Sequence, residues 1–351
     1  MILPRTFSLY CLALLATSFG ALYGEKIVQC IANFPVDAAF HTQMLQTRGY
    51  DGRVILTSID EYDAELLKRK GRIHKFLRLI NLDFPFHASV AEEVDKIVFF
   101  NIDPRIIRRY DISRFPKERL VLFMWEPKTV LPQMYTDQIH DCFSKVYTWD
   151  DSLVDNKSYF KFYYPVLRPQ IDGIPPFNEK KLCALVASNL TSKDPYELYS
   201  HRKETIAYFE AVNEPGFEFY GRGWDPLEHP SYRGEAPEKL STIKNYRFYI
   251  CYENREKTQG YVTEKIFDCF AAGTVPIYWG ASNISDFVPQ DCFINRADFA
   301  TLGELHNFIS FMPEEVYNEY LLRAELFLKS PVAKKFSYET FGQAFYEAVV
   351  N

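Results

Sequence analysis

Residues 248–254 read Phe-Tyr-Ile-Cys-Tyr-Glu-Asn, residues 261–265 read Tyr-Val-Thr-Glu-Lys, and residues 275–280 read Val-Pro-Ile-Tyr-Trp-Gly. The first and last of these runs are apolar and predict strands. Between them, the apolar spacing predicts a helix over Thr263–Ala272 that Gly273 ends. A strand, a helix and a second strand in this order predict a parallel strand pair joined by a crossover helix.

The start of this predicted helix carries the chemistry. Thr263 is a suitable N-cap, and Glu264 and Lys265 lie in the first turn. A helix N-terminus presents free N–H groups to an anion, and a lysine there opposes the dipole unless an anion offsets it. An acidic side chain suits the hydroxyls of a ribose. By spacing alone, a phosphate site and an ordinary capped surface helix remain equally good interpretations.

Strand and helix patterns alternate on both sides of this unit. Strands are predicted at Lys26–Ala32, Val54–Ser58, Lys96–Ile102, Leu120–Trp125, Lys145–Trp149, Lys181–Ala187 and Phe217–Gly221. Helices are predicted at Asp63–Leu79, Gln133–Cys142, Arg202–Val212, Leu302–Phe311, Glu314–Lys329 and Tyr338–Val350. Alternation of this kind is typical of parallel sheets with helices on both faces, so the predicted fold class is α/β.

A stretch rich in proline and glycine divides the chain. Residues 166–180 are predicted to be a linker between an N-terminal domain at 25–165 and a C-terminal domain at 181–351. Two α/β domains around a short linker form a cleft, and open parallel sheets bind ligands at the carboxyl ends of their strands.

The composition excludes some classes. The chain has 351 residues, 47% of them hydrophobic, so it can form two packed cores. Its formal net charge is −6, which argues against nucleic acid as a partner because phosphate contacts need a basic surface. No acidic cluster stands out as a metal site, and Asp150-Asp151 is the nearest to one.

Residues 1–24 differ from the rest of the chain. Arg5 is their only charged side chain, and Phe7–Gly24 is almost wholly apolar. This pattern predicts a secretory signal peptide or a signal-anchor, with a buried first element as the alternative. We expect membrane contact only through these residues, and cleavage with export if the segment is removed.

The run Tyr-Glu-Asn, Tyr-Val-Thr-Glu-Lys, Val-Pro-Ile-Tyr-Trp-Gly and Asp286-Phe-Val-Pro289 resembles the donor-binding core of the α-1,3-fucosyltransferase family, glycosyltransferase family 10. The resemblance is continuous over residues 246–299 and weaker back to Cys183. It implies the GT-B architecture, in which two Rossmann-like domains face a cleft, here with C-terminal helices. It also implies GDP-fucose as the donor substrate and no required cofactor. In a eukaryote it implies a Golgi enzyme held by a membrane anchor.

Position by position, the resemblance implies nucleotide-sugar contacts at Asn254, Tyr261, Glu264 and Lys265. Glu264 would hold the ribose hydroxyls and Lys265 the diphosphate. An arginine early in the helix after Val186-Ala-Ser-Asn189 would also bind the diphosphate. Arg202 is the candidate and Lys203 its rival, because the intervening loop is longer than the family pattern leads us to expect.

The other domain has to supply a catalytic base. In the run Leu122–Pro127, Glu126 lies at the end of a predicted strand. The family has a stretch here whose glutamate supplies the catalytic base, and Glu126 matches that glutamate. A carboxylate at a strand's carboxyl end is well placed for this role. Asp150 is the alternative base, and a strand-end Glu126 that only caps the next helix is the structural alternative.

The resemblance therefore implies an inverting transferase that moves fucose from GDP-fucose to a hydroxyl of a glycan acceptor, in an α-1,3 linkage to GlcNAc. Two alternatives stay open. One is a GT-B transferase with another nucleotide-sugar donor. The other is a non-catalytic protein of the same fold that binds a nucleotide or a sugar.

Overall fold

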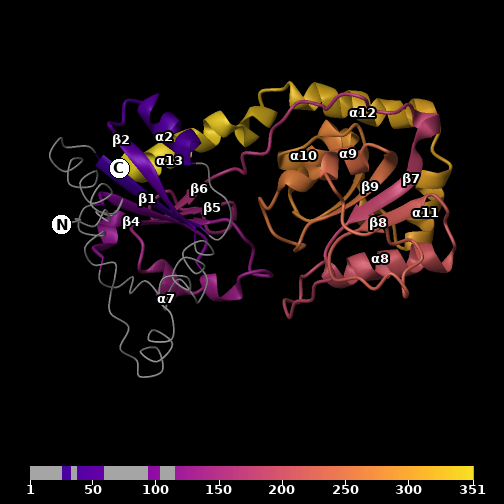
Figure 1. Ribbon diagram of the computed structural model, residues 1–351, viewed down its shortest axis with the longest axis horizontal. Helices are drawn as coiled ribbons and strands as arrows, with labels where there is room; N and C mark the ends of the chain where they lie inside the picture. The colour runs from indigo at the N-terminus through magenta and orange to yellow at the C-terminus, as the bar shows by residue number, and fades with distance from the viewer. Residues whose placement is uncertain (1–25, 33–37, 59–93, 103–114, 351) are drawn as a thin grey trace, which may run out of the picture.

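The computed structural model describes residues 26–32, 38–58, 94–102 and 115–350. Their strands form two parallel sheets, one in each half of the chain, with helices packed around them (Figure 1). The predicted α/β architecture is confirmed. The predicted leader at 1–24 and the helical pattern at Asp63–Leu79 lie outside the described residues. Within the described ranges, no helix combines the length and the apolar character needed to cross a bilayer.

The N-terminal sheet has the strand order β2-β1-β3-β4-β5-β6. Its strands are β1 (Lys26–Ala32), β2 (Gly52–Ser58), β3 (Lys96–Phe100), β4 (Leu120–Met124), β5 (Lys145–Thr148) and β6 (Tyr159–Lys161). All five side chains of β4 are buried, because the sheet is covered on both faces there, and this is why the run has no polar alternation. Strands β1 to β5 were predicted. The short strand β6 was not, because its three residues are only half-buried.

Among the described residues before β7, the α-helices are α2 (Ala38–Gln46) and α7 (Asp137–His140). Helix α2 packs beside β2 and was not predicted. Helix α7 is shorter than the predicted Gln133–Cys142, because Pro132–Met134 forms a separate 3₁₀ turn.

The C-terminal sheet has the order β11-β10-β9-β7-β8. Its strands are β7 (Lys181–Val186), β8 (Phe217–Tyr220), β9 (Tyr246–Tyr252), β10 (Val275–Trp279) and β11 (Ile294–Asn295). The helices of this part of the chain are α8 (Tyr199–Ala211), α9 (Lys239–Ile243), α10 (Glu264–Ala271), α11 (Leu302–Ser310) and α12 (Glu314–Leu328). Strands β9 and β10 are adjacent and parallel, with Cys251 opposite Tyr278. The predicted strand–helix–strand unit at 248–280 is therefore β9-α10-β10.

The stretch predicted to be a linker is attached to α10. The backbone N–H of Ile171 donates to the carbonyl of Ala271 at 2.9 Å. Arg168 forms an ion pair of 3.2 Å with Asp268, whose side chain is 5% exposed. The proline-rich stretch is therefore held to the helix that carries the predicted donor site.

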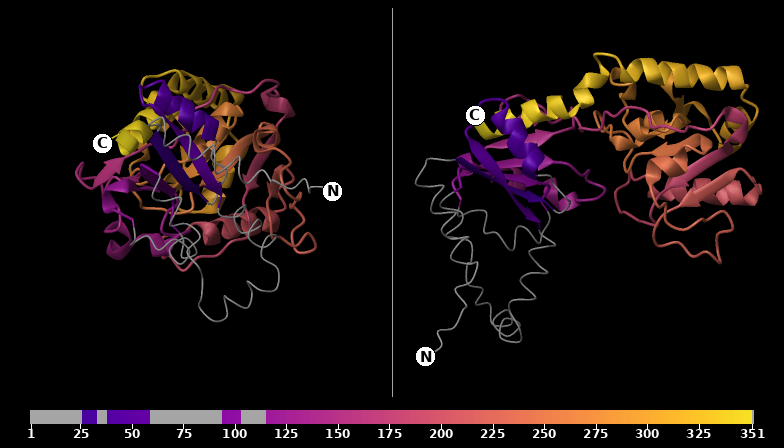
Figure 2. Two further views of the ribbon diagram at one scale, coloured as in Figure 1. Left: turned by 60° about the vertical axis from the view of Figure 1, so that its left-hand side comes forward. Right: turned by 45° about the horizontal axis from the view of Figure 1, so that its top comes forward.

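The last helix, α13 (Tyr338–Val350), returns to the N-terminal sheet (Figure 2). The ring of Phe345 stacks on Phe100 with centroids 6.2 Å apart, and Phe341 lies 5.7 Å from Phe123. The predicted C-terminal domain at 181–351 includes this helix, which instead packs on the opposite half. The aromatic residues of α13 indicate that one face of the helix is buried. Only the tertiary structure shows which of the two sheets covers that face.

Candidate active site

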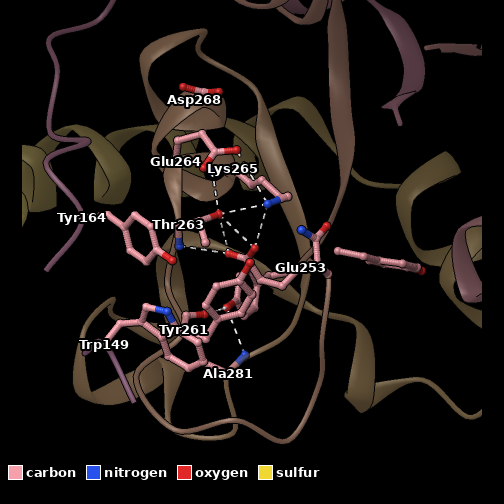
Figure 3. A network of polar contacts seen from close by, with 12 residues as sticks. Trp149, Tyr164, Glu253, Tyr261, Thr263, Glu264, Lys265, Asp268 and Ala281 are labelled. Carbon is pink, nitrogen blue, oxygen red and sulfur yellow. Dashed lines mark hydrogen bonds and ion pairs between the residues drawn. The ribbon is translucent and has the colours of Figure 1, made fainter. Parts of the chain in front are cut away.

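The end of β9 and the start of α10 form a compact polar network (Figure 3). Thr263 is the N-cap of α10, as predicted. The Glu253 side chain is fully buried and accepts hydrogen bonds from the Thr263 backbone N–H at 3.0 Å and from the Lys265 ammonium at 3.0 Å. A buried carboxylate thus holds both the helix start and the lysine in place.

The charges of this network stabilise one another. Burial would lower the pKa of Lys265, but Glu253 and Glu264 outweigh it, and the pKa is raised. Burial would raise the pKa of Glu264, but Lys265 and Lys239 outweigh it and lower the pKa to about 2. Both first-turn side chains are therefore ionised at neutral pH. A cation and a hydrogen-bond-accepting carboxylate lie together at the N-terminus of a helix, where an anion is stabilised.

Arg202 lies on α8, behind the end of β9, and is 8% exposed. Its Nη2 donates to the carbonyls of Tyr252 at 2.6 Å and Glu253 at 2.8 Å, and to Asn254 Oδ1 at 3.1 Å. In the described part of the chain no hydrogen bond occupies its Nε or Nη1. The fold therefore brings Arg202 and Asn254 together, and both lie beside the carboxylate that holds Lys265.

Tyr261 joins the two halves of the molecule. Its side chain is buried, and its ring centroid lies 4.6 Å from that of Trp149. The preceding Gly260 has φ +80°, and a Cβ atom there would lie 2.3 Å from the carbonyl oxygen of Trp149. Only glycine allows this close approach. The role of Tyr261 as a donor contact stays a prediction, while its packing role is visible.

A second contact between the halves lies beside it. Asp151 Oδ1 accepts from Lys161 Nζ at 2.6 Å, and its Oδ2 accepts from Asn283 Nδ2 at 3.1 Å. Among the described residues, no group of three or more His, Cys, Asp or Glu side chains is arranged to hold a metal ion. Asp151 belongs to the pair Asp150-Asp151, which of all acidic pairs in the sequence most resembles a metal motif. Its carboxylate instead connects the two halves of the molecule.

Glu126 follows β4 in the N-terminal half. Burial raises the pKa of its carboxyl group; Lys265 opposes the rise, and Glu264 and Glu253 add to it. The neighbouring Trp125 carbonyl accepts from Trp149 Nε1 at 3.2 Å, and the Trp149 ring packs on Tyr261, so Glu126 lies at the joint between the two halves. In the described residues no hydrogen bond reaches its carboxylate, so the group is available as a proton acceptor.

Asp150, the alternative base, is arranged differently. Its Oδ1 accepts from the Ser152 N–H at 3.0 Å and from the Ser152 hydroxyl at 2.6 Å. The carboxylate closes its own turn, as aspartates after strands often do. This geometry favours Glu126 over Asp150.

Two residues of the site were not predicted. No role is predicted for Glu253, although a carboxylate that ends an apolar run next to a lysine-bearing helix is a usable signal. Asn101 Oδ1 accepts the backbone N–H groups of both Trp125 and Glu126 at 2.8 Å. The sequence carries no signal for Asn101, because the contact joins the ends of two neighbouring strands.

The sequence around this site is similar to that of known proteins. Residues 177–337 match the family described as glycosyltransferase family 10 (fucosyltransferase) C-term. An alpha-(1,4)-fucosyltransferase of Arabidopsis thaliana is 38% identical over 80 residues, which are 22% of this chain and 20% of that protein. Alpha-(1,3)-fucosyltransferase 4 of Rattus norvegicus is 27% identical over 221 residues, which are 59% and 46% of the two chains. The chain thus spans less than half the length of these relatives.

The similarity of the whole fold extends further than that of the sequence. A crystal structure of an alpha1,3-fucosyltransferase with GDP-fucose superposes with a TM-score of 0.53 at 16% identity, over 93% of this chain and 91% of that one. The expected GT-B architecture, with two α/β halves, is confirmed. Residues 177–337 of this chain are therefore similar to glycosyltransferase family 10, the fucosyltransferase family.

Proposed function

We propose that this protein is an inverting glycosyltransferase that moves fucose from GDP-fucose to a hydroxyl of a glycan acceptor, with an α-1,3 linkage to GlcNAc. The observation that carries the proposal is the position of Glu126 at the joint between the halves. It directly follows Trp125, whose carbonyl accepts from Trp149 Nε1, and the Trp149 ring packs on Tyr261, two residues before the N-cap of α10. Its carboxyl group has a raised pKa and lies within the electrostatic influence of the cationic α10 start. A transferase needs this pair, one group for the acceptor proton and one for the leaving phosphate.

Each group has a defined task in this reaction. The Glu126 carboxylate removes the proton of the acceptor hydroxyl as that oxygen attacks the anomeric carbon of fucose. The bond to GDP breaks with an oxocarbenium-like transition state, as in glycoside hydrolysis. Negative charge grows on the departing diphosphate and is stabilised by Lys265, Arg202 and the N–H groups of α10. Glu264 accepts hydrogen bonds from the ribose hydroxyls, and Asn254 and Tyr261 complete the donor contacts.

The experiment that tests the proposal is a glycan-array assay of the purified protein with GDP-fucose, and with GDP-mannose and UDP-sugars in parallel. We expect fucose to be transferred, with the product linkage read by mass spectrometry and NMR. Transfer from another donor only would support the alternative GT-B transferase. Binding of GDP without any transfer would support a non-catalytic protein of the same fold.

The pH dependence follows from the raised pKa of Glu126. A base accepts a proton only when it is ionised, so activity falls as the pH drops through its pKa. We expect the acidic limb of the kcat/KM profile to lie above about 4.3, the ordinary value for glutamate. The limb should disappear in Glu126→Gln. A limb at or below the ordinary value would show that a carboxylate outside this buried position is titrating.

Removal of divalent cations should leave the activity unchanged. The charge of the leaving diphosphate is met by Lys265 and Arg202, so no step of the proposed mechanism requires a metal ion. We expect equal turnover with EDTA and with added Mn²⁺. Loss of activity on chelation that Mn²⁺ restores would contradict the proposed leaving-group site.

For its location, we infer that residues 1–24 bring the chain into the secretory pathway, with a Golgi membrane as the site in a eukaryote. The apolar length and the small residues of that segment support the inference. Cell fractionation with N-terminal sequencing of the protein separates an anchored chain from one that is cleaved and exported. A full-length chain in the cytosolic fraction would contradict it.

A further inference from the structure

The segment that joins β7 to α8 lies between the two halves of the molecule. It is held to the C-terminal half by the residues that follow β9. The Leu198 N–H donates to the carbonyl of Asn254 at 3.2 Å, and the Glu256 N–H donates to the carbonyl of Tyr196 at 2.9 Å. This segment belongs to the loop before Arg202 that is longer than the family pattern leads us to expect. These hydrogen bonds hold it in a defined position.

One side chain of this segment reaches the other half. Asp194 Oδ2 accepts from the Thr129 hydroxyl at 2.6 Å and from Arg255 Nε at 2.8 Å. The Asp194 side chain is 7% exposed, and Thr129 is 7% exposed as a residue. The Ser192 hydroxyl adds a hydrogen bond of 3.1 Å to the Thr129 carbonyl. Two hydrogen bonds therefore cross between the halves at Thr129, and one of them ends on a buried, ion-paired carboxylate.

Thr129 lies in the tight turn that follows the proposed base. The N–H groups of Val130 and Leu131 both donate to the carbonyl of Pro127, at 2.9 and 3.0 Å. The Tyr135 hydroxyl, farther along the same half, donates to the Glu126 carbonyl at 2.7 Å. The backbone of Glu126 is thus fixed within its own half, and Thr129 is the point where its turn is fixed to the donor half.

We propose that Asp194 is a positioning residue for Glu126. Together with Thr129 and Arg255 it forms a link, here called the Asp194 clasp, that holds the base-carrying turn against the donor-binding half. The inference rests on the proposed function and adds to it. A misplacement of about 1 Å in a reacting group lowers rates by about 10²-fold, and this clasp sets such a distance across a joint between two halves.

The clasp also couples the base to the donor site. Arg255 directly follows Asn254, which Arg202 contacts, and it donates from Nη1 to Thr258 at 2.6 Å. Arg255 is therefore held by the C-terminal half whether or not Thr129 is in place. Loss of the clasp should release the turn of Glu126 and leave the nucleotide site intact.

The test uses the full chain with Thr129→Val, which keeps the side-chain shape and removes the hydroxyl, and with Asp194→Ala. We expect the transfer kcat to fall by about 10- to 100-fold in both, because the base loses its fixed distance. The GDP affinity measured by calorimetry should change by less than about threefold, since every proposed donor contact lies in the C-terminal half. Hydrogen exchange of the amides of 128–131 should become faster.

Two further variants separate positioning from general stability. Thr129→Ser restores the hydroxyl and should recover most of the lost kcat. Thr47→Val removes another threonine hydrogen bond, a local one of 3.1 Å to the Met44 carbonyl, far from the joint, and should leave kcat unchanged. In the double variant Thr129→Val with Asp194→Ala, the loss should equal that of Asp194→Ala alone, because the two side chains act through one contact.

The outcomes distinguish the clasp from the proposed function. An unchanged kcat and unchanged exchange at 128–131 in Thr129→Val would overturn the clasp, even if Asp194→Ala failed to fold. An equal loss of kcat and GDP affinity would also overturn it, as a structural effect. If the unaltered protein transfers no fucose, the proposed function fails, and the exchange measurement still decides whether Asp194 holds the turn.

Discussion

Replacing Glu126 with glutamine should lower fucosyl transfer by about 10²- to 10⁴-fold, the range typical of a lost general base. Glutamine keeps the size of the side chain but cannot accept the proton of the acceptor hydroxyl. Steady-state kinetics with GDP-fucose and the acceptor identified on the array measure the effect. The affinity for GDP should stay almost unchanged, because the nucleotide contacts lie in the other half.

Asp150→Asn is the matched control for this variant. Both residues follow neighbouring strands of the same sheet, but the Asp150 carboxylate is engaged by Ser152. We expect a small change in turnover for Asp150→Asn. Near-normal turnover in Glu126→Gln together with a large loss in Asp150→Asn would assign the base to Asp150 instead.

Replacing Lys265 with alanine should weaken GDP binding by about 10²-fold. Removing one member of a buried, hydrogen-bonded charge pair costs about 2–5 kcal/mol, partly because its partner is left unpaired. Here the partner is Glu253, a buried carboxylate that would then face the diphosphate without a cation. Calorimetric titration with GDP measures the effect, with thermal unfolding as a check that the variant is folded.

Two variants complete this experiment. Lys257→Ala removes an exposed lysine of the same C-terminal half and should leave GDP binding unchanged, because surface ion pairs contribute little. Lys265→Ala combined with Glu253→Gln should bind GDP better than Lys265→Ala alone, since the unpaired carboxylate is neutralised. Unchanged GDP affinity in Lys265→Ala would reject the phosphate assignment for this residue.

Much of the fold is visible in local sequence patterns. Strands such as β4 and β9 are short apolar runs, and a strand buried on both faces has no alternative but to be apolar. The Thr263 cap and the Gly273 end of α10 were also predicted, because both depend on residues within a single turn. Short or half-buried elements, such as β6, lack such a pattern and were missed.

The candidate site likewise contains residues that the sequence indicates and residues that only the tertiary structure favours. Glu264 and Lys265 are found as candidates from the sequence because a lysine in the first turn of a helix opposes the helix dipole unless an anion offsets it, whereas a carboxylate is favourable there. Arg202 and Lys203 are neighbours in sequence, and only the packing of α8 behind β9 favours Arg202 as the residue that contacts Asn254. The preference for Glu126 over Asp150 likewise rests on contacts that no spacing encodes.

Local order along the chain was therefore enough to predict two α/β halves, most of their strands and the N-cap of α10. These features depend on interactions between residues that are close in sequence. The attachment of α13 to the N-terminal sheet, the buried Glu253 beneath Lys265 and the contact of Thr129 with Asp194 depend on distant residues. Such contacts are decided only when the whole chain has packed, because each buried polar group must then find its partner in three dimensions.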